Sequence, residues 1–104
     1  MNTQQTEIRR IVRMTFREDA LPEFLALFHQ SKNQIRNREG CLHLELWQDA
    51  DAPHICTTFS IWQSQAHLNA YRKSELFGQV WPATKILFAA KPLAFSVRQT
   101  VQLK

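Results

Sequence analysis

The sequence predicts an α+β, ferredoxin-like fold, in which a split β-α-β pattern builds a four-stranded antiparallel sheet with helices on one face. Alternating apolar and polar residues indicate strands near both ends of the chain and in a central hairpin. Apolar residues three and four positions apart indicate helices between these strands. The length of 104 residues, 44% of them hydrophobic and 21% charged, is typical of one globular domain. We therefore expect a single domain over residues 1–104, with its core at about residues 8–99.

The first strand is expected in IRRIVRMTFR, residues 8–17. Two sets of residues alternate along it: Ile8, Arg10, Val12, Met14 and Phe16 on one side, and Arg9, Ile11, Arg13, Thr15 and Arg17 on the other. The net charge of +4 and the four arginines of this stretch suggest a nucleic-acid-binding protein as an alternative. The alternation favours a sheet strand with one apolar and one mixed face, so we expect no nucleic-acid partner.

The first helix is expected in LPEFLALFHQSKNQI, residues 21–35, where apolar residues recur at helical spacing. Pro22 falls in the first turn, where a proline is tolerated, and Asp19 is the expected N-cap. Phe24 and Phe28 share the apolar face of this helix, which should therefore pack against the sheet.

Residues 41–49 and 54–62 are expected to form an antiparallel hairpin that turns at DADAP, residues 49–53. Its second strand alternates Ile55, Thr57, Phe59 and Ile61 with Cys56, Thr58, Ser60 and Trp62. We expect Thr57 to face the helices and Trp62 to face away from them. Cys41, placed with His43 on that second side, and Cys56 are separated by about five residues along the hairpin, which is too far for a disulfide. Both thiols should be reduced and buried.

The remaining elements are two helices and a last strand. Ser64 is expected to cap a helix through residue 73, and Ser74 to cap a second helix that Pro82 interrupts. The last strand is expected over residues 92–100, with Leu93 and its alternate neighbours on one face.

One layer of helices covers only one face of a four-stranded sheet. The other face is expected to carry Ile11, Trp47 and Trp62 beside His43, Ser60 and the paired charges of Glu45, Arg9 and Arg13. Such a face is too apolar for water, so a second copy should cover it with its own sheet. The expected assembly is a homodimer in the form of a dimeric α/β barrel.

Two segments carry a resemblance to a known family: GCLHLELWQD at residues 40–49 and WQSQAHLNAYRKSELF at residues 62–77. Over about residues 8–99 the sequence resembles the antibiotic biosynthesis monooxygenase family, also called the dimeric α/β-barrel family. That family includes cofactor-free monooxygenases of aromatic polyketides, quinol oxidases and haem-degrading enzymes. The resemblance implies a cofactor-independent monooxygenase that acts on a small aromatic, quinol or polyketide-like substrate.

The polar groups of two branches of that family are replaced here. Ser60, Tyr71 and Leu76 stand where the quinol-oxidising branch has a glutamate and two histidines. Val12, Tyr71 and Trp81 stand where the haem-degrading branch has an asparagine, a tryptophan and an axial histidine. Tryptophan cannot ligate iron, and no histidines and carboxylates have metal-ligand spacing, so we expect no metal and no cofactor. These replacements favour an alternative function, a non-catalytic dimer that binds a small ligand or has a regulatory role.

A pocket between the sheet and the helices is the expected binding site for a flat aromatic ring. Its expected substrate-binding residues are Arg10, Phe24, Phe28, Thr57, Tyr71, Phe77 and Trp81. Arg10 could stabilise a phenolate, and Thr57 could hydrogen-bond to it. His67 lies four residues before Tyr71 on one helix face and titrates near neutrality, so these two are the candidate catalytic residues. The alternative is that the aromatic residues are ordinary core, Arg10 a solvated strand end and Thr57 a plain strand former.

The chain shows no signal for membrane association. No apolar run approaches the roughly 20 residues that a membrane-spanning helix needs. Residues 1–10, MNTQQTEIRR, lack the apolar segment of a secretory signal. We therefore expect a cytoplasmic protein.

Overall fold

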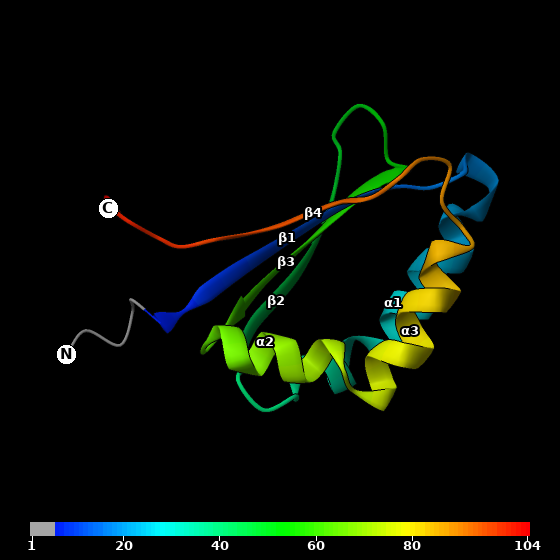
Figure 1. The fold of residues 1–104 in the computed structure, drawn as a ribbon. Helices are drawn as coiled ribbons and strands as arrows, with labels where there is room; N and C mark the ends of the chain where they lie inside the picture. The colour runs from blue at the N-terminus through cyan, green and yellow to red at the C-terminus, as the bar shows by residue number, and fades with distance from the viewer. Residues whose placement is uncertain (1–5) are drawn as a thin grey trace.

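The computed structural model describes residues 6–104 as a four-stranded sheet with helices on one side (Figure 1). Its elements are β1 (Ile8–Thr15), the 3-10 turn η2 (Glu18–Ala20), α1 (Leu21–Arg36), β2 (Cys41–Gln48), β3 (Ile55–Trp62), α2 (Gln65–Arg72), α3 (Glu75–Lys85) and β4 (Leu93–Val97). This order confirms the predicted α+β, ferredoxin-like fold. The prediction about a secretory signal rests partly on residues 1–5, which lie outside the described residues.

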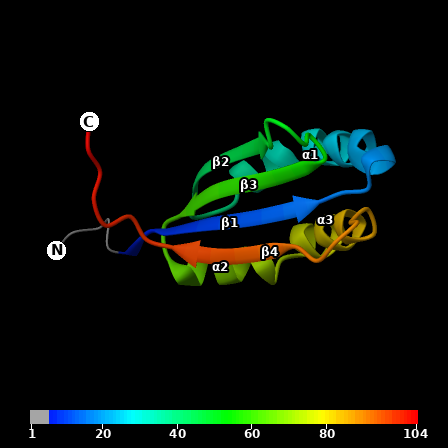
Figure 2. The ribbon, with the colours of Figure 1, turned by 90° about the horizontal axis from the view of Figure 1, so that it is seen from above.

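The sheet has the strand order β2-β3-β1-β4, and every neighbouring pair is antiparallel. Seen from above, the strands lie over α1, α2 and α3, and the near face of the sheet is uncovered (Figure 2). No helix within residues 6–104 is long and apolar enough to cross a membrane. The sheet thus has a helix-covered face and an open face.

The register between β1 and β3 assigns side chains to these two faces. Ile8 lies opposite Trp62 and Arg10 opposite Ser60, and partners in an antiparallel pair point to the same face. Trp62 is only 1% exposed and packs with Leu68 of α2, so this set faces the helices. The prediction for β3 was therefore wrong: Thr57 lies on the open face, and Ser60 and Trp62 lie on the helix-covered face.

An irregularity in β2 moves Cys41 to the helix-covered side. Cys41 lies opposite Trp62, whereas His43 lies opposite Ile61, so a β-bulge falls between them. Because of this bulge, Cys41 packs with Ile8 and Trp62 while His43 stays on the open face. The sequence placed Cys41 and His43 on one face, which was wrong. Both cysteines are free and buried, as predicted.

The open face carries Ile11, His43, Glu45 and Trp47, as predicted, but neither Ser60 nor Trp62. Its apolar members include Ile11, Trp47, Phe59, Leu93, Phe95 and Val97. Glu45 accepts hydrogen bonds from His43 and from Trp47 Nε1 (2.7 Å), both on its own strand. The expected pairing of Glu45 with the arginines of β1 is absent from the described residues. The reason is that residues two apart on one strand share a face and reach one another first.

The helix boundaries follow some of the predicted caps. Ser64 Oγ accepts from the His67 N–H and Ser74 Oγ from the Phe77 N–H, so both predicted serine caps are confirmed. Asp19 is not an N-cap, because it lies inside η2 and α1 begins after Ala20.

Pro82 does not interrupt a helix, contrary to the prediction. α3 continues through Pro82 to Lys85. Trp81 and Thr84, on either side of the proline, pack into the protein, and Thr84 Oγ1 donates to the Val80 carbonyl (2.8 Å). Tertiary packing of this kind supplies most of a helix's stability and can outweigh one lost backbone bond.

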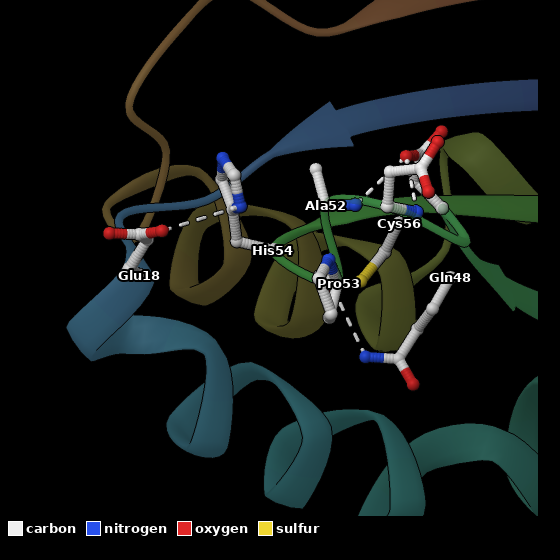
Figure 3. A network of polar contacts seen from close by, with 8 residues as sticks. Glu18, Gln48, Ala52, Pro53, His54 and Cys56 are labelled. Atoms are coloured by element: carbon white, nitrogen blue, oxygen red, sulfur yellow. Dashed lines mark hydrogen bonds and ion pairs between the residues drawn. The ribbon is translucent and has the colours of Figure 1, made fainter.

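Polar contacts hold the loop between β2 and β3 (Figure 3). Asp49 Oδ2 accepts from the backbone N–H groups of Asp51 (3.2 Å) and Ala52 (3.0 Å). Gln48 Nε2 donates to the Pro53 carbonyl (3.1 Å). His54 Nδ1 lies 3.9 Å from Glu18 of η2, so this loop is tied to the turn before α1.

Gly40 brings the start of β2 against α2. Its φ of +85° is a left-handed conformation that other residues adopt at a cost. A Cβ at this position would overlap the Cβ and Cγ of His67, whereas a Cβ at Gly78 in α3 would meet nothing within 4 Å. The two glycines therefore have different roles.

We expect Gly40→Ala to lower the free energy of unfolding by at least about 2 kcal/mol, because backbone strain adds to the overlap with His67. Gly78→Ala is the control and should raise it by about 0.5–1 kcal/mol, because alanine is the better helix former. Urea denaturation followed by circular dichroism measures both. Equal effects of the two substitutions would contradict this account.

Candidate functional site

A cavity of about 230 Å³ lies between the helix-covered face of the sheet and the three helices. The sheet contributes Arg10, Val12, Met14, Leu44, Thr58, Ser60, Trp62 and Ala94; the helices contribute Phe24, Phe28, Ile35, Leu68, Tyr71, Arg72, Phe77, Val80, Trp81 and Thr84. Among the described residues, the lining includes no histidine, cysteine, aspartate or glutamate. The cavity is therefore mainly apolar, with two arginines as the only charged groups that residues 6–104 contribute to it.

Four rings form one side of this cavity, which we call the aromatic wall: Trp62, Tyr71, Phe77 and Trp81. Tyr71 stacks on Trp62 with ring centroids 5.0 Å apart, and Phe77 stacks on Trp81 at 5.8 Å. Tyr71 and Phe77 meet edge to face at 5.2 Å. The wall thus offers ring faces and edges against which a flat aromatic ligand can pack.

The break between α2 and α3 positions the middle of the aromatic wall. Ser74 Oγ donates to the Tyr71 carbonyl (2.6 Å) and accepts from the Phe77 N–H (3.2 Å). One side chain therefore satisfies the last turn of α2 and the first turn of α3. The two rings on either side of Ser74 are held at the same cavity.

The hydroxyl of Tyr71 is not a base at neutral pH. Burial raises the pKa of Tyr71 to about 12; the nearby Cys41 also raises this pKa, and Arg38 lowers it. A phenol with such a pKa stays protonated and can donate a hydrogen bond to a ligand.

Arg10 is the polar group on the β1 side of the cavity. Its Nη1 donates to Ser96 Oγ of β4 (3.1 Å). The pKa of Arg10 lies below its ordinary value because burial disfavours the charge and because Arg72 lies nearby. Beside it, Ser60 is buried and its Oγ accepts from Trp62 Nε1 (3.0 Å). Arg10 thus places a guanidinium in a half-buried position between two serine hydroxyls.

The structure brings most of the predicted site residues together. Those that line the cavity are Arg10, Phe24, Phe28, Tyr71, Phe77 and Trp81. Thr57 does not, because it lies on the open face, and Thr58 takes its place. The parts these residues play in binding and catalysis stay predictions.

His67 lies outside the cavity lining. Its ring packs on Gly40, and its Nδ1 lies 2.7 Å from Ser64 Oγ. The imidazole thus belongs to the N-terminal turn of α2, one turn before Tyr71. The geometry gives His67 a structural contact, and its part in catalysis stays a prediction.

Sequence reasoning missed Trp62, Ser60 and Arg72 as residues of the cavity. For Trp62 and Ser60 the alternation of β3 was visible, but it did not show which of its two sets faces the helices. Arg72 directly follows the predicted site residue Tyr71 at the end of α2, and this position could have indicated that Arg72 lies near the cavity.

The sequence matches a known protein family. Residues 7–81 match the family model described as antibiotic biosynthesis monooxygenase. No match is found among curated proteins.

Solved structures with the same fold share little sequence with the chain. A conserved protein from Methanosarcina mazei Go1 is 18% identical with a TM-score of 0.89, covering 94% of this chain and 97% of its own. Rv0793 from Mycobacterium tuberculosis is 19% identical with a TM-score of 0.86, covering 95% and 100%. A protein described as an antibiotic biosynthesis monooxygenase is 17% identical with a TM-score of 0.85, covering 90% and 99%. At these identities the likeness concerns the fold.

The single tyrosine of the chain makes the environment of Tyr71 measurable. We expect its tyrosinate absorbance to appear with a midpoint near pH 12 in the folded protein, against about 10 in the unfolded chain. Full stability should hold below pH about 10, and the free energy of unfolding should fall as the pH rises from there through 12, since the unfolded chain ionises first. A folded-state midpoint near 10 would contradict the burial of this hydroxyl.

Proposed function

Because the chain belongs to the antibiotic biosynthesis monooxygenase family, we propose that it is a cofactor-independent monooxygenase of a small, flat, electron-rich aromatic molecule. The observation that carries this proposal is the aromatic wall beside a mainly apolar cavity that also contains Arg10. Such a cavity suits a phenol or hydroquinone, whose ring stacks and whose oxygen needs one positive partner.

The reaction requires little from the side chains. A deprotonated phenol with an activated ring carbon can itself pass electrons to dioxygen, so the substrate supplies the reducing power. One oxygen atom enters the substrate at the activated ring carbon and the other leaves as water, so that a phenol and O₂ become a quinone and H₂O. The two hydrogens of this water come from the ring C–H and the phenolic O–H. The protein must hold the substrate, favour its anion and exclude bulk water.

Arg10 is the residue that favours the substrate anion in this proposal. Its guanidinium is half-buried and is held on one side by Ser96. A positive charge in such a place stabilises a phenolate more than it would in water. The phenolic proton is lost to solvent as the substrate binds, because the described lining has no group that accepts a proton at neutral pH.

The size of the cavity restricts the substrate. Its volume of about 230 Å³ is below the roughly 300–1,000 Å³ usual for small-molecule pockets. A molecule of one to a few fused rings suits this space better than a large polyketide.

A second function, non-catalytic binding of a small aromatic ligand, is favoured by one observation. No general base lines the cavity among the described residues, and the raised pKa of Tyr71 keeps its hydroxyl protonated. Binding without turnover needs only the aromatic wall and Arg10.

We further propose that the chain forms a homodimer through the open face of the sheet. Trp47 stacks on Phe59 with centroids 5.3 Å apart, and Trp47 is still 44% exposed. Leu93, Phe95 and Val97 of β4 are exposed on the same face. A contiguous apolar surface on a sheet is stabilised when a second sheet covers it.

Oxygen consumption in the presence of a panel of hydroquinones and naphthols tests the enzymatic proposal. We expect at least one of them to be oxidised faster with protein than without.

Trp81→Ala should weaken ligand binding by about 1–3 kcal/mol through the lost stacking surface, and Trp81→Phe should weaken it less. Calorimetry measures these affinities. Binding without oxygen consumption would favour the non-catalytic alternative, and unchanged affinity in Trp81→Ala would remove the aromatic wall from the site.

Sedimentation tests the dimer. We expect a species of about twice the 12.2 kDa of one chain at micromolar concentration. Trp47→Ala should raise the dissociation constant of the dimer at least about tenfold, because a central aromatic residue commonly dominates an interface. Ile86→Ala is the control, since Ile86 is 71% exposed but lies at the end of α3, away from the open face. A monomer at these concentrations would contradict the proposal.

A further inference from the structure

Two guanidinium groups reach the same small cavity from opposite layers of the protein. Arg10 belongs to β1 in the sheet, and Arg72 is the last residue of α2. Within residues 6–104 neither of them forms an ion pair, and the cavity lining has no carboxylate. The cavity therefore has two positive charges without a negative partner.

This arrangement is electrostatically unfavourable without a ligand. The pKa of Arg10 is lowered first by burial and then by the charge of Arg72. Arg10 is half-buried and Arg72 is exposed, so water screens the repulsion between their like charges only in part, and a bound anion replaces this repulsion with attraction. The neighbouring apolar rings carry no negative charge and cannot offset this repulsion.

Ordinary structural roles do not explain the pair. Arg72 lies at the C-terminus of α2, where a cation interacts well with the helix dipole, so Arg72 alone would carry no inference. Arg10 is on a strand in the middle of the sheet, between β3 and β4, and has no helix end to stabilise. The convergence of the two at one cavity is what requires an explanation.

We propose that Arg10 and Arg72 together bind a carboxylate of the substrate, so that the substrates are small aromatic acids. This inference rests on the proposed function and specifies its substrate class. The guanidinium fork matches a planar carboxylate with two parallel hydrogen bonds. Ser96 Oγ accepts from one nitrogen of Arg10 and so orients the fork. A ring attached to that carboxylate then extends toward the aromatic wall, whose member Tyr71 directly precedes Arg72.

A carboxylate fits better than a phosphate for reasons of space and hydration. The cavity has a volume of about 230 Å³, of which the ring needs a large share. A phosphate is bulkier than a carboxylate and doubly charged near neutral pH. Most of the lining is apolar and could not replace its hydration.

The test compares two probes that share a ring system, 2-naphthoate and 2-naphthol. Calorimetry on the full chain measures the affinity of each, and oxygen consumption is recorded in parallel with 1-hydroxy-2-naphthoate. The wild-type protein should bind 2-naphthoate at least about tenfold more tightly than 2-naphthol, as expected for one added charge-assisted hydrogen bond.

The variants identify the residues responsible. Arg72→Gln should weaken 2-naphthoate about tenfold and leave 2-naphthol within about twofold, because only the charge-assisted contact is lost. Arg10→Gln should also weaken 2-naphthoate. Lys73→Gln is the matched control: it removes the same charge from an exposed neighbour outside the cavity lining and should change neither affinity.

The outcomes separate this inference from the proposed function. Selective loss of 2-naphthoate binding in Arg72→Gln, whether or not oxygen is consumed, supports the aromatic acid class. Equal affinities of the two probes, equal weakening of both in Arg72→Gln, or an equal effect of Lys73→Gln would overturn it. Selective binding with no oxygen consumption would contradict only the monooxygenase. If neither probe binds, the inference fails together with the aromatic site.

Discussion

The pairing of β1 with β3 is the constraint on which the cavity depends. Because successive strand residues point to opposite faces, a shift of one residue would turn Trp62 and Ser60 to the open face. Burial of the whole indole of Trp62 against α2 makes such a shift costly, since a large buried side chain contributes about 1.5–3 kcal/mol. The same register puts Arg10 beside the hydroxyls of Ser60 and Ser96.

The helix layer complements this face through two close contacts. Gly40 lets His67 approach the backbone at the start of β2, and this brings α2 down onto the sheet. Ser74 then ends α2 and starts α3 within one residue. The change of direction places Tyr71 and Phe77 at one cavity, where a continuous helix would have packed one unbroken ridge against the strands. Local hydrogen bonding thus leaves the space that a ligand can occupy.

The two faces of the sheet differ in the side chains they carry and therefore in the kind of partner they can bind. The helix-covered face combines an apolar cavity with two cations, which suits a flat anion such as the proposed aromatic acid. The open face combines the stacked Trp47 and Phe59 with the exposed side chains of β4, which suits another sheet. Since alternate residues of the same strands serve both faces, the site and the proposed interface are coupled by the strands they share.

The sequence by itself determined the order of the elements, the caps at Ser64 and Ser74 and the presence of Tyr71 and Trp81 at the site. These depend on local chemistry: side-chain hydrogen bonds within three residues and periodicities of 2 and 3.6. The tertiary structure alone decided which face of β3 meets the helices. The alternation of β3 divides its residues between two faces, but both groups contain apolar side chains, so the pattern does not tell which group is buried against the helices. It also decided the bulge after Cys41, the continuation of α3 through Pro82 and the meeting of Arg72 with Arg10. Each of these results from packing between segments distant in sequence, which no local pattern contains.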